Sequence, residues 1–162
     1  MELYHASNME VSRPKIMNLK VNLDFGAGFY TTTNKEQAED FAAKVYLRQG
    51  KNGVPTVNVY EFDDSALKLK ELKFKSPSYK WFDFVVHNRK YGRREDDYDL
   101  IVGPVANDDV FFIIALYEQG RETRAGAIRR FKVKKLFNQY LFCNERALSA
   151  ITFIESYSPR VK

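Results

Sequence analysis

Apolar and polar positions alternate most clearly in Thr56 to Phe62, TVNVYEF. This period of two is typical of a strand with one buried face. Tyr98 to Val102 ends in three consecutive apolar residues instead, Leu100 to Val102, which favours a strand near the centre of a sheet. Weaker patterns of β-branched, aromatic and aliphatic residues predict the other strands, at Glu2 to Ser7, Phe29 to Thr33, Leu67 to Leu69, Glu71 to Phe74, Asn138 to Cys143 and Ile151 to Tyr157.

A helical period begins directly after the Phe29 to Thr33 segment. Gly50 is placed to end this first helix, because glycine accepts the left-handed backbone at a helix C-terminus. The apolar face of the helix is expected to consist of Ala38, Phe41, Ala42 and Val45. Two pairs of residues have the spacing of a capping box at its start, Thr33 with Glu36 and Asn34 with Gln37.

Capping residues and glycine stops predict three further helices. They run from Ser76 or Ser78 to about Tyr91, from Asn107 or Asp108 through Val110 to Tyr117, and over the basic segment Thr123 to Phe137. Asn8 to Leu23 is expected to form one short helical turn and a loop, because Pro14 interrupts it. Gly103 and Pro104 are expected to turn the chain out of the preceding strand. Strands and helices without regular βαβ alternation indicate an α+β domain with two small, mostly antiparallel sheets.

The stretch Asp24 to Ala42 combines a glycine turn, a short strand and a capped helix. Gly26 and Gly28 allow the backbone to bend sharply or to approach a ligand closely. Tyr30, on the strand that follows, can then stack on a flat ligand. The alternative interpretation is a purely structural hairpin.

The chain has 162 residues, which suits one domain over residues 1–157 and a frayed tail over 158–162. Hydrophobic residues make up 44%, which is enough for a sizeable core and argues against disorder. No apolar run reaches the roughly 20 residues that a membrane helix needs, and the N-terminus lacks the pattern of a signal peptide. We therefore expect a cytoplasmic protein, or an effector delivered without a signal peptide. The single cysteine, Cys143, has apolar neighbours and favours a buried, inert thiol.

The net charge of +5 is concentrated in two places. Residues 121–135 hold seven Arg or Lys and one Glu, and residues 89–94 hold four Arg or Lys. These segments are either solvated helix surfaces or docking surfaces for phosphates and acidic partners. A metal site is not expected, because His5 and His87 lack the spacing of metal ligands.

Three short stretches resemble, in order, motifs of the poly(ADP-ribose) polymerase and diphtheria-toxin group of ADP-ribosyltransferases. They are Leu3 to Ser7 (LYHAS), Phe25 to Tyr30 (FGAGFY) and Asn138 to Tyr140 (NQY). The chain from about residue 2 to 154 is also similar to a bacterial family catalogued as domain of unknown function 3990. The resemblance implies a split β-sandwich with NAD as substrate in the cleft between its sheets, and no metal.

The resemblance also implies roles for individual residues. His5, Tyr30 and Gln139 stand at the positions of the His-Tyr-Glu triad, with His5 bonding ribose hydroxyls and Tyr30 stacking on nicotinamide. Phe41 would close the other side of the ring, and the backbone of Ala6 would meet the carboxamide. The implied NAD contacts are His5, Ala6, Ser7, Gly28, Tyr30, Thr32, Phe41 and Gln139, with the Thr33 hydroxyl nearby.

Gln139 departs from the triad, because the polymerases have a catalytic glutamate there. Glutamine can accept a hydrogen bond but brings no negative charge. The charge could instead come from Asp108, Asp109 or Glu145, although the two aspartates are equally explained as helix N-terminal residues.

The sequence therefore predicts single ADP-ribose transfer to a protein or nucleic-acid acceptor, as in a toxin-like or regulatory effector with a possible small neutralising partner protein. The alternatives are an inactive module that binds NAD, ADP-ribose or a partner, and an NAD glycohydrolase. No membrane partner is expected.

Overall fold

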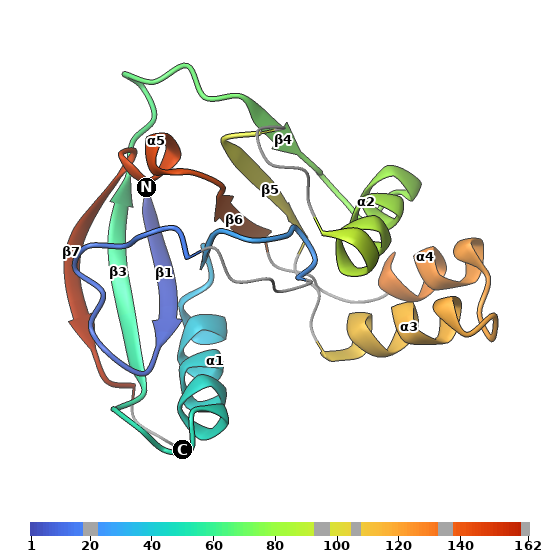
Figure 1. Cartoon of the computed structure of the whole chain (residues 1–162), viewed down its shortest axis with the longest axis horizontal. Coiled ribbons are helices and arrows are strands. Elements are labelled where there is room, and N and C mark those ends of the chain that lie inside the picture. The colour runs from blue at the N-terminus through green and yellow to red at the C-terminus, as the bar shows by residue number, and fades with distance from the viewer. Residues whose placement is uncertain (18–22, 93–97, 105–107, 133–137, 160–162) are drawn as a thin grey trace.

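A computed structural model describes residues 1–17, 23–92, 98–104, 108–132 and 138–159, with the backbone alone at 108–110 and 132. The described strands form one seven-stranded sheet in the order β4-β5-β6-β2-β1-β3-β7 (Figure 1). The expectation of an α+β domain is confirmed, whereas the expected division into two separate sheets is not seen. The strands are β1 (Glu2–Ser7), β2 (Phe29–Thr32), β3 (Thr56–Phe62), β4 (Glu71–Lys73), β5 (Leu100–Pro104), β6 (Asn138–Phe142) and β7 (Ile151–Tyr157).

The sheet is mixed, because β4 and β5 run parallel while the other neighbouring strands run antiparallel. Its middle is weakly joined. Strands β1 and β2 pair at one position, Tyr4 opposite Thr32, whereas β1 pairs with β3 from Glu2 to Ser7. In Figure 1, β1, β3 and β7 lie side by side on one side of the molecule, and β4, β5 and β6 lie on the other.

Five helices are described: α1 (Lys35–Arg48), α2 (Tyr79–Tyr91), α3 (Asp108–Glu118), α4 (Arg124–Lys132) and α5 (Glu145–Leu148). Asn34 caps α1 by accepting a hydrogen bond from the Gln37 amide, which confirms one of the two predicted capping pairs. Ser78 caps α2 in the same way, through the Trp81 amide. The short α5 was not predicted.

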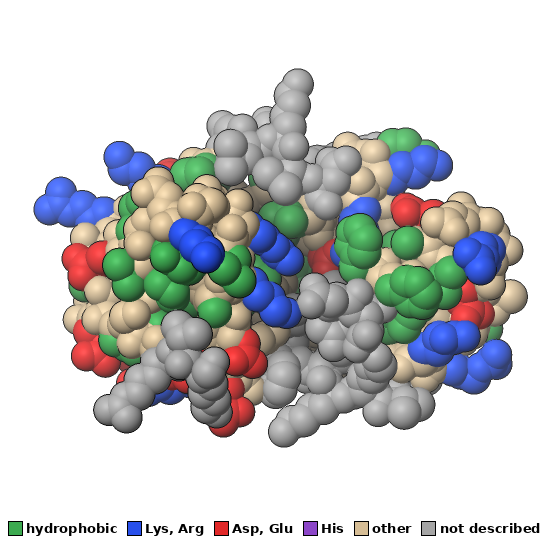
Figure 2. Space-filling model, turned by 90° about the horizontal axis from the view of Figure 1, so that it is seen from below, with side chains coloured by type: hydrophobic (Ala, Val, Ile, Leu, Met, Phe, Trp, Pro, Cys, Tyr) green, Lys and Arg blue, Asp and Glu red, His purple; other side chains and the backbone are tan. Residues whose placement is uncertain are grey.

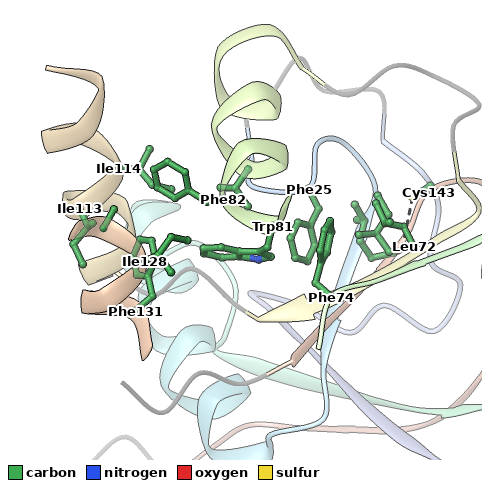
Figure 3. Packing of buried hydrophobic residues seen from close by; sticks show 14 residues of the cluster. Phe25, Leu72, Phe74, Trp81, Phe82, Ile113, Ile114, Ile128, Phe131 and Cys143 are labelled. Atoms are coloured by element: carbon green, nitrogen blue, oxygen red, sulfur yellow. Dashed lines mark hydrogen bonds between the residues drawn. The ribbon is translucent and has the colours of Figure 1, made fainter. Parts of the chain in front are cut away.

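The two faces of the sheet are covered by different elements. On one face, α1 packs through Ala38 and Ala42 on β1 and β3. On the same face, α2, α3 and α4 cover the β5 and β6 side with an aromatic-rich cluster around Trp81. Figure 3 shows the indole lying between the side chains of α3 and α4 and those of Phe25 and Phe74. The opposite face is covered by α5 and by the segment 8–17.

The structure corrects several sequence expectations. The predicted turn at Gly103 and Pro104 is instead the end of β5, paired with Gln139 and Asn138. Leu67 to Leu69 forms no strand, and residues 8–17 contain no helical turn. Several predicted segments lie outside the described residues. They are residues 18–22 of the predicted Asn8 to Leu23 loop, Asn107, residues 133–137 of the predicted fourth helix and residues 160–162 of the tail.

Candidate functional site

The three residues at the triad positions lie on three neighbouring strands in the middle of the sheet. His5 is on β1, Tyr30 on β2 and Gln139 on β6, and β2 lies between the other two strands. Gln139 lies directly opposite Thr32 of β2. Three segments far apart in the sequence therefore form adjacent strands.

The imidazole of His5 reaches across to β2, where Nδ1 lies 2.7 Å from the Tyr30 carbonyl oxygen. Because a carbonyl oxygen only accepts, Nδ1 carries the hydrogen and donates it. The ring also stacks on Phe29, with 4.2 Å between ring centroids. Burial lowers the pKa of His5 below its ordinary value of 6.5, and this effect outweighs the opposing influence of the Tyr30 carbonyl. His5 is therefore neutral at pH 7, and its Nε2 presents a lone pair that can accept a hydrogen bond.

The hydrogen bond of His5 lies where the pairing of β1 and β2 ends. Continued from Tyr4 opposite Thr32, the register would place Ala6 opposite Tyr30, but no such pair forms in the described strands. The imidazole binds the Tyr30 carbonyl in place of the backbone ladder. We call this opening between the C-terminal end of β1 and the N-terminal end of β2 the seam.

The side chain of Tyr30 folds back onto the glycine turn that precedes its strand. Its hydroxyl donates to the Gly26 carbonyl at 2.6 Å and accepts from the Phe25 amide at 3.3 Å. The ring packs beside the aromatic-rich cluster and stays partly exposed. Tyr30 therefore fixes the turn.

Gln139 and Tyr30 lie on the face of the sheet that carries α1, since Gln139 is opposite Thr32 and residues alternate along a strand. His5 extends toward the opposite face, where it meets Phe29. A ligand that touches all three side chains must therefore cross the seam. Figure 2 shows the molecule hollowed between the side that carries α1 and the side that carries α3 and α4.

Other expected NAD contacts are already engaged in the fold. The Thr32 hydroxyl donates to Gln37 at 2.8 Å and accepts from the Asn34 amide, so it helps to start α1. Gly28 has a φ of 151°, and a Cβ there would lie 2.5 Å from the Phe142 carbonyl oxygen. The close approach of β6 requires a glycine at this position.

Ala6 and Ser7 lie at the seam end of β1, opposite Val57 and Thr56 of β3. The sequence predicts Phe41 on the buried face of α1. The structure corrects this, because Phe41 is 45% exposed. It lies beneath the Arg48 guanidinium at 5.6 Å instead. Thr33 is exposed just before α1.

Of the three candidate carboxylates, Glu145 has a described side chain, and it does not lie beside Gln139. Glu145 begins α5 and accepts a hydrogen bond from the Ile16 amide at 3.1 Å, on the face opposite Gln139. Asp108 and Asp109 begin α3, and their side chains lie outside the described atoms.

Sequence reasoning missed a connection that holds the glycine turn from α2. Arg89 forms an ion pair with Asp24 at 2.5 Å, and the two side chains are only 16% and 12% exposed. The neighbouring Asn88, which is buried, donates to the Asp24 carbonyl oxygen at 3.0 Å. No sequence signal marks this contact, because 64 residues separate Asn88 from Asp24. We call Asp24, Asn88 and Arg89 the turn clamp.

Some arginines of the basic segments form ion pairs with nearby acids. Arg124 pairs with Asp83, and Arg130 pairs with Glu122 at 2.7 Å. No group of three or more potential metal ligands occurs within the described residues. No described helix has the length and apolar character needed to cross a membrane.

The fold and the site define an α+β protein with a mixed seven-stranded sheet and a polar seam at its centre. Residues 1–153 match a family described as a protein of unknown function (DUF3990), and because the match covers most of the chain, the chain belongs to this family. No curated protein matches the sequence.

Proposed function

We propose that this protein cleaves the nicotinamide–ribose bond of NAD and transfers a single ADP-ribose to a macromolecular acceptor. The observation that carries the proposal is the His5 to Tyr30 hydrogen bond at the seam, with Gln139 on the next strand. This arrangement supports the resemblance to the His-Tyr-Glu transferases. The single β1–β2 pair also supports it, because a ligand cleft in a split sandwich requires the sheet to open at its centre.

The chemistry requires the site to orient the dinucleotide and to stabilise an oxocarbenium-like sugar. In this proposal Nε2 of neutral His5 accepts a hydrogen bond from a ribose hydroxyl, since Nδ1 is held by Tyr30. The Tyr30 ring stacks on nicotinamide, and the Gln139 amide oxygen accepts a hydrogen bond from a hydroxyl of the nicotinamide ribose. The departing nicotinamide is neutral, so little acid catalysis is needed.

Gln139 favours one competing function, an inactive module that binds NAD or ADP-ribose. Without a carboxylate the site lacks one source of charge stabilisation, and such a loss typically costs about 10²–10³ in rate. Glu145 is held by the Ile16 amide on the other face and does not replace it in this arrangement. We therefore expect slow turnover and no polymer.

The experiment that tests the proposal incubates the purified chain with biotin-labelled NAD and bacterial lysate, beside the His5→Ala variant. Labelled products that disappear in the variant would support transfer, and their intact mass should show one ADP-ribose unit. Nicotinamide release without labelling would indicate hydrolysis instead. Binding of NAD with neither labelling nor release would favour the inactive module and contradict the proposal.

A further inference from the structure

Exposed aromatic side chains are concentrated on the helical side of the molecule. Among the residues with described side chains, five Phe or Tyr rings are strongly exposed, and four of them lie on α2 and α3. Phe111 and Phe112 are 61% and 60% exposed, and Tyr91 is 68% exposed. Figure 2 shows hydrophobic side chains exposed on the side that carries α3 and α4, with Lys and Arg around them.

Three of these four rings have a cation over them. The Arg89 guanidinium lies 4.7 Å from the Phe111 ring centroid, and Lys90 Nζ lies 5.1 Å from that of Tyr91. Arg124 lies over Tyr79 at 4.4 Å. A cation on one face of a ring leaves the other face for a flat partner. We call Tyr79, Tyr91, Phe111 and Phe112, with these cations, the aromatic–cation surface.

The surface presents separate rings and positive charge. Tyr79 and Tyr91 stand at opposite ends of α2, about 18 Å apart along a helix of this length. Both lie away from the buried side of α2, which Trp81 and Val85 occupy. Separate stacking rings spread over such a distance suit an extended chain of flat groups better than a helix docking along a continuous groove.

Positive charge for a polyanion remains available beside the rings. Arg89 and Arg124 are paired with Asp24 and Asp83, so their charge is largely offset. Arg121 and Arg129 are exposed and form no ion pair among the described side chains, and the exposed Lys90 is attracted by Glu118. These residues can contact phosphates while the rings stack on bases.

We propose that the aromatic–cation surface binds single-stranded RNA, independently of whether the seam turns over NAD. Single strands are the usual targets of recognition by aromatic stacking, because their bases are exposed. The exposed His87 lies beside Tyr91, with 5.1 Å between ring centroids, and adds a hydrogen-bonding group next to a stacking ring. Such groups can contact the ribose 2′-hydroxyl, which distinguishes RNA from DNA.

The test measures binding of the full chain to a fluorescein-labelled 12-nucleotide RNA of mixed sequence by anisotropy, without NAD. We expect saturable binding that weakens as salt rises, and weaker binding to duplex RNA and to DNA of the same sequence. The double variant Phe111→Ala with Phe112→Ala should bind about tenfold more weakly or worse, since stacking supplies much of the affinity. Phe111→Trp keeps a stacking surface and should bind within about twofold of the original protein.

A matched control is Ile154→Ala, which removes an exposed apolar side chain from β7, away from these helices. It should bind RNA as the original protein does, and circular dichroism should show all variants folded. The proposal is overturned if the double variant binds unchanged, if duplex RNA or DNA binds as tightly, or if polyglutamate of equal charge competes as well as RNA. Because no NAD is present, these results do not depend on the transferase proposal.

Discussion

At the scale of single residues, His5 couples the pH to the stability of the seam. Its folded-state pKa lies below the ordinary value of 6.5, because burial disfavours the charged ring. Between these two pKa values the unfolded chain binds a proton that the folded chain does not. The contribution of His5 to the unfolding free energy is therefore fully present above about pH 7. It is lost as the pH falls through 6.5 toward the folded-state pKa.

We predict that His5→Asn removes this loss, because the asparagine amide can still donate to Tyr30 but does not titrate. Urea unfolding of both proteins at about pH 8, 6.5 and 5.5 would measure this pH-dependent loss, because these values bracket the ordinary pKa of histidine. The difference in unfolding free energy between the two proteins should shrink as the pH falls. A parallel loss in both would contradict the prediction. The pKa of Asp99 is also lowered, but this carboxyl group takes up its proton below about pH 4 and does not titrate in the pH range of the experiment.

The effects of the Tyr30 ring and of its hydroxyl can be measured separately with two substitutions. Tyr30→Phe removes the donor to the Gly26 carbonyl oxygen and should lower the unfolding free energy by about 1 kcal/mol. It keeps the ring, so NAD affinity should change little. Tyr30→Ala removes the stacking surface as well and should weaken NAD binding. Calorimetric titration with NAD, with chemical unfolding of each variant, measures both effects, and equal affinity of all three proteins would exclude Tyr30 from the site.

At the scale of elements, the turn clamp connects α2 to the glycine turn before β2. We predict that Arg89→Ala lowers the unfolding free energy by about 3 kcal/mol, because it breaks an ion pair with Asp24 that is largely shielded from water. Urea unfolding measures this effect.

The control for that prediction is Arg124→Ala, which breaks a pair with Asp83 whose two side chains are 43% and 55% exposed. An exposed ion pair contributes about 1 kcal/mol or less, so this variant should stay close to the original protein. If both variants lose the same stability, the clamp contributes no more than a surface pair.

The elements also show which sequence patterns predict structure. β3 and the starts of α1 and α2 follow from local alternation and capping residues, and the structure has them where the sequence places them. Phe41 was wrongly assigned to the buried face of α1, because the small Ala38 and Ala42 already bring the helix close to the sheet. The four-residue α5 is too short to produce a period.

Gly103 and Pro104 show how sheet context overrides a local turn signal. Glycine followed by proline commonly marks a turn. Here β4 ends at Lys73, opposite Val102, so β5 has no β4 partner at its last two residues. Proline is tolerated at such an edge because its missing amide hydrogen is not required there.

At the scale of the whole molecule, the motifs indicate which strands carry the candidate residues but not how the sheet opens between β1 and β2. The order of motifs brings His5, Tyr30 and Gln139 to adjacent strands. The single sheet depends on one pairing, Tyr4 with Thr32, and pairing across 28 residues has no local signature. The opposite orientation of His5 follows from that register, and for this reason it could not be read from the three motifs.

This geometry leads to a prediction about Gln139 that only the assembled fold can test. Gln139 lies half-buried on the α1 face of the sheet, next to Thr32 and beside Tyr30 in the neighbouring strand. Gln139→Glu changes little in size but supplies a carboxylate where the proposed reaction develops positive charge on the ribose. We predict that nicotinamide release rises by about 10²-fold, the effect typical of one preorganised group that stabilises a transition state.

The measurement is nicotinamide release from NAD at pH 8, where a carboxylate is ionised, with His5→Ala introduced into the Gln139→Glu background as the control. A gain that disappears with His5→Ala would mean that both residues act on one ligand across the seam. An unchanged or lower rate, with NAD still bound, would mean that no sugar cation develops beside Gln139. The carboxylate that acts in the reaction would then lie elsewhere in the molecule.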